Sequence, residues 1–342
     1  MVEAMIFEIK TRAQELNQQK IDTIYFGGGT PSLLSSDQLS KIFDTLNQFF
    51  DLSNVSEVTL EANPEDITQE KLELWKTHKI NRLSIGIQSL NNFELQKMNR
   101  NHRAEESKTA ISKSLQAGFD KITIDLIYGT PWKSDKEWLE ELDWALKSGI
   151  NHLSAYALTI EPQTLLAHQI EKNKEIVPPD EKTIVQFELL QQKIDEHGWD
   201  AYEISNYCLP NSEAIHNSNY WSGKNYLGIG PSAHSYNGNI RRWNVANNAL
   251  YIHKIFENEI YFEEEILTPQ NKANEFIMTQ LRTKKGLNFK DILSVAPNWR
   301  KLNQKSIDRF VIQQYMIQTT EGISLTSKGK MISDYIISEF MI

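Results

Sequence analysis

Polar and glycine residues follow one predicted strand after another in the first half of this sequence. They are the run Gly27–Gly28–Gly29–Thr30–Pro31, then Glu61, Gln88, Asp125 with Tyr128, and Thr159 with Glu161. The carboxyl ends of parallel strands meet at one edge of a sheet, where ligands bind in α/β folds. A loop after each strand explains some of this polarity, but not Glu61 after Val-Thr-Leu or Gln88 after Ser-Ile-Gly-Ile. The pattern therefore predicts a binding site at this edge.

The glycine run and Glu61 are suited to a polar ligand. Successive glycines let the backbone approach a ligand closely and offer it amides and carbonyls. The sequence around them lacks the GxxxxGK[ST] pattern, so a nucleoside triphosphate P-loop is not indicated. A tight turn between strand and helix is the structural alternative. Glu61 could bind ribose hydroxyls or an ammonium group, or be an ordinary solvated carboxylate.

Three further polar residues have distinct chemistry. Gln88 offers both a donor and an acceptor, and Arg100 can bind a carboxylate through two parallel hydrogen bonds. Asp125 lies between apolar neighbours in ITIDLI. An acid in such surroundings is paired or functional, because burying an unpaired charge is costly.

Two histidines lie in a stretch rich in aromatic and Asn residues, from Tyr202 to Trp243. His216 is part of HNSNYW and His234 of GPSAHS. Each histidine alone reads more simply as structural. Together with the surrounding Tyr and Trp, they suit a planar aromatic ligand such as a porphyrin, in which an imidazole can bind iron.

The elements that position these residues follow from hydrophobic periodicity. Strands are predicted at 21–27, 57–62, 82–87, 122–127 and 152–158, and helices at 2–18, 36–50, 68–75, 104–117 and 134–147. A helix between each pair of strands is the βαβ rhythm of a parallel sheet. We therefore expect a parallel α/β barrel or part-barrel.

The rhythm ends after residue 160. We expect a long helix at 180–197, a short strand at 201–205, a long functional loop at 206–245 and helices from about 265. A hairpin turning at Glu321–Gly322 and a helix capped by Thr326 make the end of the chain similar to a winged helix. The predicted domains are a partial barrel at 1–200, an aromatic extension at 201–264 and a winged-helix-like domain at 265–342.

Composition narrows the class of protein. The chain has 342 residues, of which 40% are hydrophobic and 24% charged, as in ordinary globular proteins. No apolar run approaches the ~20 residues of a transmembrane helix, and the first residues have no signal-peptide core. The single cysteine, Cys208, excludes a disulfide within the chain, fits a reducing cytoplasm and reads as a small core residue. From Asn271 onward the chain has 11 basic and 6 acidic residues, although its overall net charge is −9.

The segments IYFGGGTPSLL, LEANPE, RLSIGIQSL, ITIDLIYGTP and LSAYALTIEP, in this order, resemble the radical S-adenosylmethionine (SAM) family of anaerobic coproporphyrinogen III oxidases. YEISNYC, HNSNYW and YLGIGPSAHS are more similar to its HemW branch, the heme chaperones. The resemblance covers about residues 2–340. It implies an α/β fold: a partial (β/α) radical-SAM-type barrel lacking its first strand, followed by a C-terminal helical, winged-helix-like domain.

The resemblance also implies site residues. Gly28, Gly29 and Thr30 would hold the methionyl part of SAM, and Glu61 its ribose region. The positions around a second SAM or the tetrapyrrole would be Gln88, Arg100, Asp125 and Thr159. His234 stands where the oxidases carry an apolar residue that contacts SAM. His216 matches the motif proposed to bind heme in the HemW branch.

One departure from the family is large. The family binds a [4Fe–4S] cluster through CxxxCxxC in the loop after its first barrel strand, and this sequence begins in the helix that would follow. Three thiolate ligands are needed and one distant cysteine exists. Two explanations stay open: roughly one βα unit lies upstream, which the intact later motifs favour, or the chain is a member without a cluster.

Three functions are weighed. The first is a heme chaperone that binds heme and SAM and delivers heme to respiratory proteins, with peripheral association with the membrane. The second is an oxygen-independent coproporphyrinogen III oxidase of porphyrin biosynthesis, whose substrate is a porphyrinogen. The third, a DNA-binding regulator, conflicts with the acidic remainder of the chain, so no nucleic-acid partner is expected. The sequence favours the first.

Overall fold

The computed structural model describes residues 1–342 except 17–19, 163, 173–175 and 178. Its largest sheet has seven strands in the order β1-β2-β3-β4-β5-β7-β6. The strands are β1 (Thr23–Phe26), β2 (Glu57–Ala62), β3 (Arg82–Gln88), β4 (Lys121–Tyr128), β5 (His152–Ala157), β6 (Asp200–Ala201) and β7 (Asn206–Cys208). The first five are parallel to one another, and β7 is antiparallel to both β5 and β6. The predicted parallel α/β part-barrel is confirmed.

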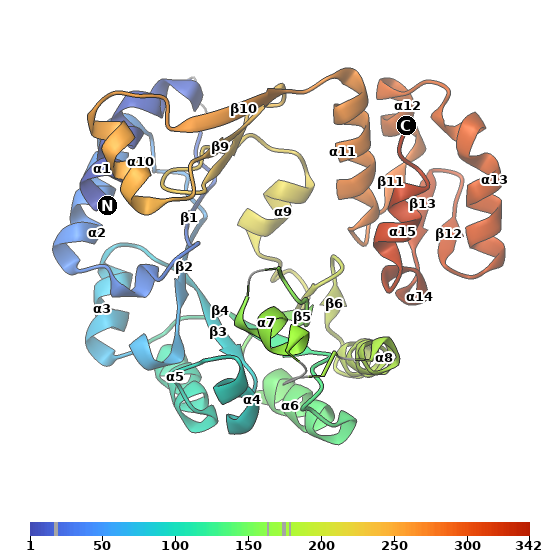
Figure 1. Ribbon diagram of the computed structural model, residues 1–342, viewed down its shortest axis with the longest axis horizontal. Coiled ribbons are helices and arrows are strands. Elements are labelled where there is room, and N and C mark those ends of the chain that lie inside the picture. Colours follow the sequence, from blue (N-terminus) through green and yellow to red (C-terminus); the bar gives the residue numbers. More distant parts are fainter. Residues whose placement is uncertain (17–19, 163, 173–175, 178) are drawn as a thin grey trace.

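Helices cover the outer face of this curved sheet (Figure 1). They are α1 (Val2–Arg12), α2 (Ser36–Phe49), α3 (Gln69–Thr77), α4 (Asn92–Lys97), α5 (Ala104–Gln116), α6 (Asp135–Lys147) and α8 (Asp180–Glu196). The short helix α7 (Leu165–Glu171) follows β5, and three 3₁₀ turns are η1 (Ala13–Leu16), η2 (Pro31–Leu33) and η3 (Pro64–Asp66). Ser35 and Ser134 begin α2 and α6 with capping boxes, which satisfy free amides of each first turn. The first predicted helix is too long, because the α-helix ends at Arg12.

Apolar and polar residues alternate along the strands, so that the outer face of the sheet is apolar and the inner face is polar. Residues such as Leu60, Leu83 and Ile124 are fully buried in the core between sheet and helices. Successive strand residues point to opposite faces, so Thr59, Ser84 and other residues one position away line the interior. The barrel interior is therefore a polar chamber.

The middle of the chain crosses above the barrel. It contains α9 (Ile215–Trp221), α10 (Asn248–Phe256) and an antiparallel sheet of β8 (His234–Tyr236), β9 (Ile240–Asn244) and β10 (Phe262–Ile266) in the order β10-β9-β8. The predicted strand at 201–205 is wrong: β6 ends at Ala201 and β7 begins at Asn206. The predicted long loop at 206–245 is also wrong, since it holds β7, α9, β8 and β9.

The last part of the chain packs around its own apolar core, which includes Ile277, Trp299 and Phe340. Its elements are α11 (Pro269–Leu281), β11 (Leu287–Asn288), α12 (Phe289–Val295), α13 (Trp299–Ile312), β12 (Met316–Gln318), β13 (Gly322–Leu325), α14 (Ser327–Lys330) and α15 (Ser333–Ser338). The predicted hairpin is present as β12 and β13, which pair antiparallel. Helices followed by this hairpin give the winged-helix-like arrangement at the right of Figure 1.

No helix in the part of the chain that the structure describes is long and apolar enough to cross a membrane.

Candidate functional site

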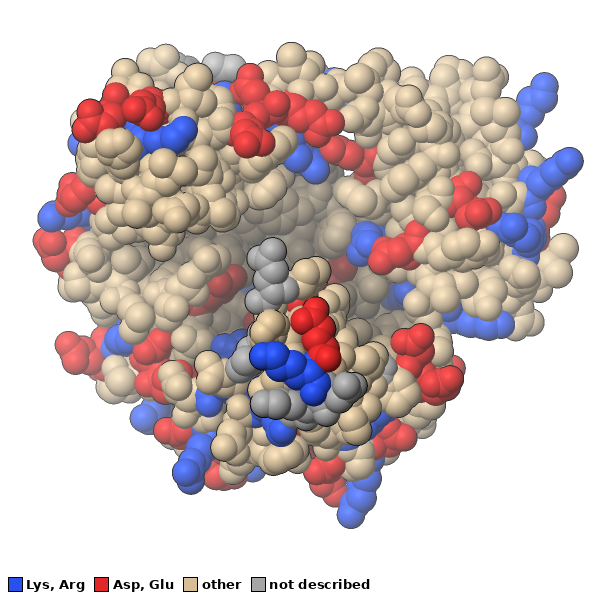
Figure 2. Space-filling view, in the orientation of Figure 1, with Lys and Arg blue, Asp and Glu red and all other residues tan. Residues whose placement is uncertain are grey.

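The barrel interior forms a cavity of about 300 Å³. It is lined by residues of β1 to β5, of β7 and of α9, the last of which comes from the middle of the chain. Figure 2 shows the surface hollowed between the barrel and the segments around it. Three of the predicted site residues line this cavity: Glu61, Asp125 and His216.

Glu61 joins the glycine turn to the cavity. Its carboxylate accepts a hydrogen bond from the Tyr25 hydroxyl at 2.7 Å and another from the Gly28 amide at 3.1 Å. Burial and the Glu61 charge raise the pKa of Tyr25, so the phenol stays protonated and donates. Glu61 is therefore a partnered acceptor at the mouth of the barrel, and a ligand with hydroxyl or ammonium donors would meet it there.

The glycine turn has the backbone that the sequence requires. Gly28 has φ +78°, which favours glycine, and a methyl group on Gly27 would overlap the Tyr25 ring and the Glu61 carboxylate. Nothing lies within 4 Å of the position a side chain would take on Gly28 or Gly29. The exposed Thr30 follows them and precedes η2. This turn is thus open on the side where a ligand would approach.

The pKa of Asp125 is shifted strongly by its position inside the barrel. Burial raises its pKa from the ordinary 3.8 to about 7. The Ser154 hydroxyl opposes the rise, the Glu61 charge adds to it, and the Arg100 charge opposes it. Near neutral pH, Asp125 is therefore a group that can hold or release a proton inside the cavity.

His216 is held from several sides. Its Nδ1 forms a hydrogen bond of 2.7 Å with Thr23 Oγ1, and its Nε2 one of 3.2 Å with the Tyr220 hydroxyl. The Tyr25 ring stacks on the imidazole, with centroids 4.8 Å apart and planes at 21°. Burial lowers the pKa of His216, although Glu57 opposes the shift. The imidazole is therefore neutral at pH 7, which is the form that binds a metal.

The start of α9 is anchored by a buried ion pair. The Glu57 carboxylate accepts hydrogen bonds from the amides of Ile215 at 3.1 Å and of His216 at 2.9 Å. Arg82 Nε donates to Glu57 at 2.9 Å, and both side chains are buried. Glu57 and Arg82, at the N-terminal ends of β2 and β3, thus hold α9 against β1.

The floor of the cavity holds two buried polar atoms that lack a hydrogen-bond partner in the described structure, Thr59 Oγ1 and His152 Nδ1. The other ring nitrogen, His152 Nε2, lies 2.8 Å from the Tyr202 hydroxyl. Burial, with the nearby Arg82 charge, holds the pKa of His152 well below its usual value. His152 is therefore a neutral, polar residue of the cavity floor beside the Arg82–Glu57 ion pair.

The other predicted residues are not among the cavity lining. Gln88 is buried at the end of β3, where its backbone has φ +70°. Arg100 follows α4 in the chain. Thr159 is exposed after β5, and its hydroxyl donates to the carbonyl of Ala157. His234 is exposed at the start of β8, where its ring stacks on Trp243.

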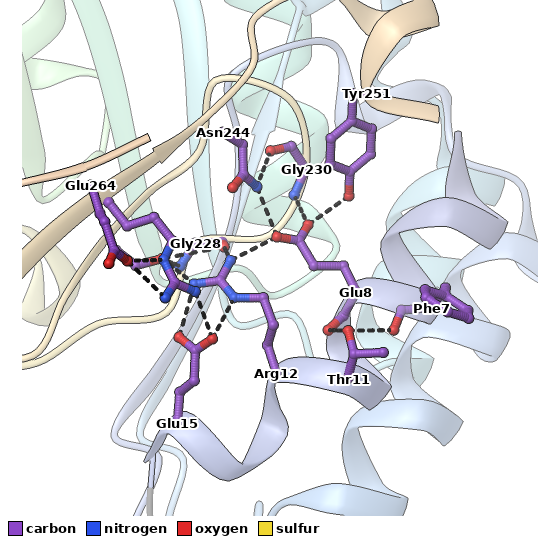
Figure 3. A network of polar contacts seen from close by, with 12 residues as sticks. Phe7, Glu8, Thr11, Arg12, Glu15, Gly228, Gly230, Asn244, Tyr251 and Glu264 are labelled. Carbon is purple, nitrogen blue, oxygen red and sulfur yellow. Dashed lines mark hydrogen bonds and ion pairs between the residues drawn. The ribbon is translucent and has the colours of Figure 1, made fainter. Parts of the chain in front are cut away.

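A buried network fixes the loop that leads to His234 (Figure 3). The Glu8 carboxylate accepts hydrogen bonds from Arg12 at 2.6 Å, from Tyr251 at 2.5 Å, and from Asn244 and the Gly230 amide at 2.8 Å. Arg12 also donates to the Gly228 carbonyl at 2.9 Å. Through this network α1 holds the loop between α9 and β8.

Sequence reasoning missed Thr23, Tyr25, Glu57 and Arg82. Their signal was available, because Thr23 and Tyr25 lie two positions apart on one strand, as do Glu57, Thr59 and Glu61 on the next. Polar residues at every second position of a barrel strand face the interior. Thr23, Tyr25, Glu57 and Arg82 precede the carboxyl ends of their strands, where the polar pattern is most visible.

The residues present do not fit an iron–sulfur cluster. Cys208 is the single cysteine of these 342 residues and is a free thiol buried in β7. Burial raises its pKa to about 12. Among the described residues no group of three or more His, Cys, Asp or Glu side chains could hold a metal ion. These residues therefore cannot provide three thiolates.

Comparisons with known proteins agree on one family. Residues 7–145 match the radical SAM superfamily. The heme chaperone HemW of Bacillus subtilis is 32% identical over 327 residues, which cover 95% of this chain and 86% of that protein. HemW of Lactococcus lactis is 29% identical over 344 residues, covering 100% and 90%.

A solved structure shows the same fold. The coproporphyrinogen III oxidase HemN from Escherichia coli, described as a radical SAM enzyme, superimposes with a TM-score of 0.83 and 21% identity. The match covers 99% of this chain and 82% of that one. The fold of the barrel and of the C-terminal part is thus shared with HemN.

Proposed function

Since the chain belongs to the HemW branch of the radical SAM superfamily, we propose that it is a heme chaperone that binds heme at His216. The observation that carries the proposal is the setting of this imidazole. It is neutral, fixed by Thr23 and Tyr25, and open at Nε2 except for the Tyr220 hydroxyl.

An aromatic row supports a flat ligand at this place. From His216 it continues through Tyr220, Tyr226 and Tyr236, with ring centroids 5.0, 4.8 and 6.0 Å apart in turn. The rings meet mainly edge to face, so several faces are available for contact with a porphyrin. A displaced Tyr220 hydroxyl would leave Nε2 to the iron.

SAM would lie at the mouth of the barrel. Gly28, Gly29 and Thr30 would receive its methionyl part and Glu61 its ribose region, which agrees with the open glycine turn and the accepting carboxylate. Gln88, Arg100, Asp125, Thr159 and His234 are proposed to complete the site for SAM or the tetrapyrrole. In the superfamily a [4Fe–4S] cluster accompanies SAM, but these residues do not supply its thiolates.

The cargo would pass to heme-accepting respiratory proteins. A neutral imidazole as the single protein ligand of the iron would allow release as well as capture, as a carrier requires. We place this transfer in the cytoplasm, with the chain meeting its acceptors at the membrane surface. The proposed division of work is a SAM-type core at 1–200, a heme-binding extension at 201–264 and a partner-facing domain at 265–342.

A titration of the full chain with ferric heme tests the proposal. Wild-type protein should bind with a shifted Soret band, and His216→Ala should lose at least tenfold in affinity. His253→Ala, an exposed histidine on α10, is the matched control and should bind like wild type. Equal, weak binding by wild type and His216→Ala would exclude the chaperone function.

The shared fold with HemN makes coproporphyrinogen III oxidation the second candidate. It requires a reducible cluster, so it is tested on anaerobically reconstituted protein isolated from the native host. Formation of protoporphyrinogen would favour the oxidase, and its absence together with tight heme binding would favour the chaperone.

A further inference from the structure

Thr23 occupies one of the two ring nitrogens of His216. Thr23 Oγ1 lies 2.7 Å from Nδ1, on the side of the ring that faces β1. We propose that Thr23 is a positioning residue that holds His216 as its Nδ1–H tautomer, so that Nε2 is the unprotonated nitrogen offered to iron. The inference rests on the proposed function and adds the residue that sets its geometry.

Glu57 favours the tautomer of His216 that carries its proton on Nδ1. Its carboxylate accepts the backbone amide of His216 at 2.9 Å, and Nδ1 is the ring nitrogen nearer the backbone. A buried negative charge on this side favours a proton on Nδ1 over a lone pair there. The Nδ1 proton is then donated to Thr23 Oγ1, and the Tyr220 hydroxyl donates to Nε2.

The opposite arrangement would block the site. If Thr23 donated to Nδ1, then Nε2 would carry the proton and could not bind a metal until the ring changed tautomer. A ligating histidine usually donates its second nitrogen to a fixed acceptor, and loss of that acceptor typically costs about 10–100-fold in metal affinity. Thr23 fills that role here.

The ring plane is fixed separately from the tautomer. Tyr25 stacks on the imidazole at 4.8 Å, so a change at Thr23 removes the hydrogen bond without removing the stacking. The hydrogen bond from Tyr220 to Nε2, at 3.2 Å, is longer than the one at Nδ1. The weaker contact is therefore the one that heme would displace.

The chain offers a conservative series. Thr23→Val removes the hydroxyl and keeps the β-branched shape that suits a strand, whereas Thr23→Ser keeps the hydroxyl. Thr109→Val is the matched control, because Thr109 is an exposed residue of α5 outside the cavity lining, and its hydroxyl also makes a hydrogen bond, to the Glu105 carbonyl. Circular dichroism and melting temperature confirm that each variant is folded.

The experiment has two independent readouts on the full chain. Nitrogen-15 NMR of histidine-labelled protein without heme reads the tautomer, and His216→Ala assigns the signal among the eight histidines. Wild type and Thr23→Ser should show the Nδ1–H form, and Thr23→Val a mixture. In ferric heme titrations, Thr23→Val should lose about 10–100-fold in affinity. Thr23→Ser should stay within about threefold of wild type, and Thr109→Val should bind like wild type.

The outcomes separate the two proposals. A wild-type signal of the Nε2–H form, or wild-type heme affinity in folded Thr23→Val, would overturn the role of Thr23 while leaving heme binding intact. Equal heme affinity in wild type and His216→Ala would overturn the heme function and the inference together.

Discussion

Tyr25 lies against His216 with ring centroids 4.8 Å apart, and its hydroxyl donates to Glu61 at 2.7 Å. One side chain of β1 therefore touches both the proposed heme ligand and the carboxylate beside the glycine turn. The two proposed binding sites are neighbours that share a residue.

Changes at Tyr25 should separate the two contacts. Tyr25→Phe keeps the stacking and removes the bond to Glu61, so heme affinity should change by less than about threefold while SAM affinity falls by about tenfold. The reason is that a hydrogen bond to a charged group contributes about 1.5–3 kcal/mol. Tyr25→Ala should weaken both ligands, as measured by calorimetry. Unchanged binding of both ligands to Tyr25→Ala would refute the link.

Asp125→Asn should remove part of the pH dependence of stability. Because the pKa rises from 3.8 to about 7 on folding, the folded protein holds a proton that the unfolded chain has lost between these values. The free energy of unfolding therefore falls as pH rises through this window, by about 1.4 kcal/mol per pH unit at most.

Urea unfolding of wild type and Asp125→Asn measures this effect directly. The variant should exceed wild type in stability by a few kcal/mol near pH 8, and the two should converge below about pH 4, where Asp125 is protonated in the unfolded chain as well. It should also bind SAM or heme more weakly without losing the fold. Parallel stability curves across this range would show that Asp125 does not titrate there.

Glu8 and Glu15 form a matched pair for the network around Arg12. Both accept hydrogen bonds from Arg12, but Glu8 is fully buried and Glu15 is more than one-third exposed. Glu8→Ala should cost about 3–5 kcal/mol in the free energy of unfolding, since it leaves a buried arginine with less compensation. Glu15→Ala should cost about 1 kcal/mol or less. Similar losses in chemical denaturation would contradict the role of burial.

Gly28 and Gly29 should respond differently to alanine. Both have open space where a side chain would go, but only Gly28 has a positive φ, at +78°. Gly28→Ala should lower stability by about 1–2 kcal/mol, while Gly29→Ala should be nearly neutral. Thermal melts of the two variants check this, and equal effects at Gly28 and Gly29 would contradict the role of the positive φ.

Much of the fold follows from local sequence. The five parallel strands were predictable because apolar residues recur within them and a helix with a serine or threonine cap follows several of them. Glu61 and Asp125 were found for a related reason, since polar residues at or near the end of an apolar strand stand out.

The anchoring of His216 was not predictable in this way. Helix α9 consists of residues with modest helix propensity, and its first amides are bound by Glu57, which lies 158 and 159 positions away along the chain. Thr23 and Tyr25 read as ordinary strand residues until the neighbouring α9 is known. These contacts depend on tertiary packing, which no local pattern reports.

Chemical rescue tests the central claim most directly. Heme bound to the full chain should show an iron–histidine signature by resonance Raman spectroscopy in the ferrous state. The account predicts that His216→Ala loses this signature and that added imidazole restores it. A His216→Ala complex that keeps the wild-type signature without imidazole would contradict the assignment of His216 as the heme ligand.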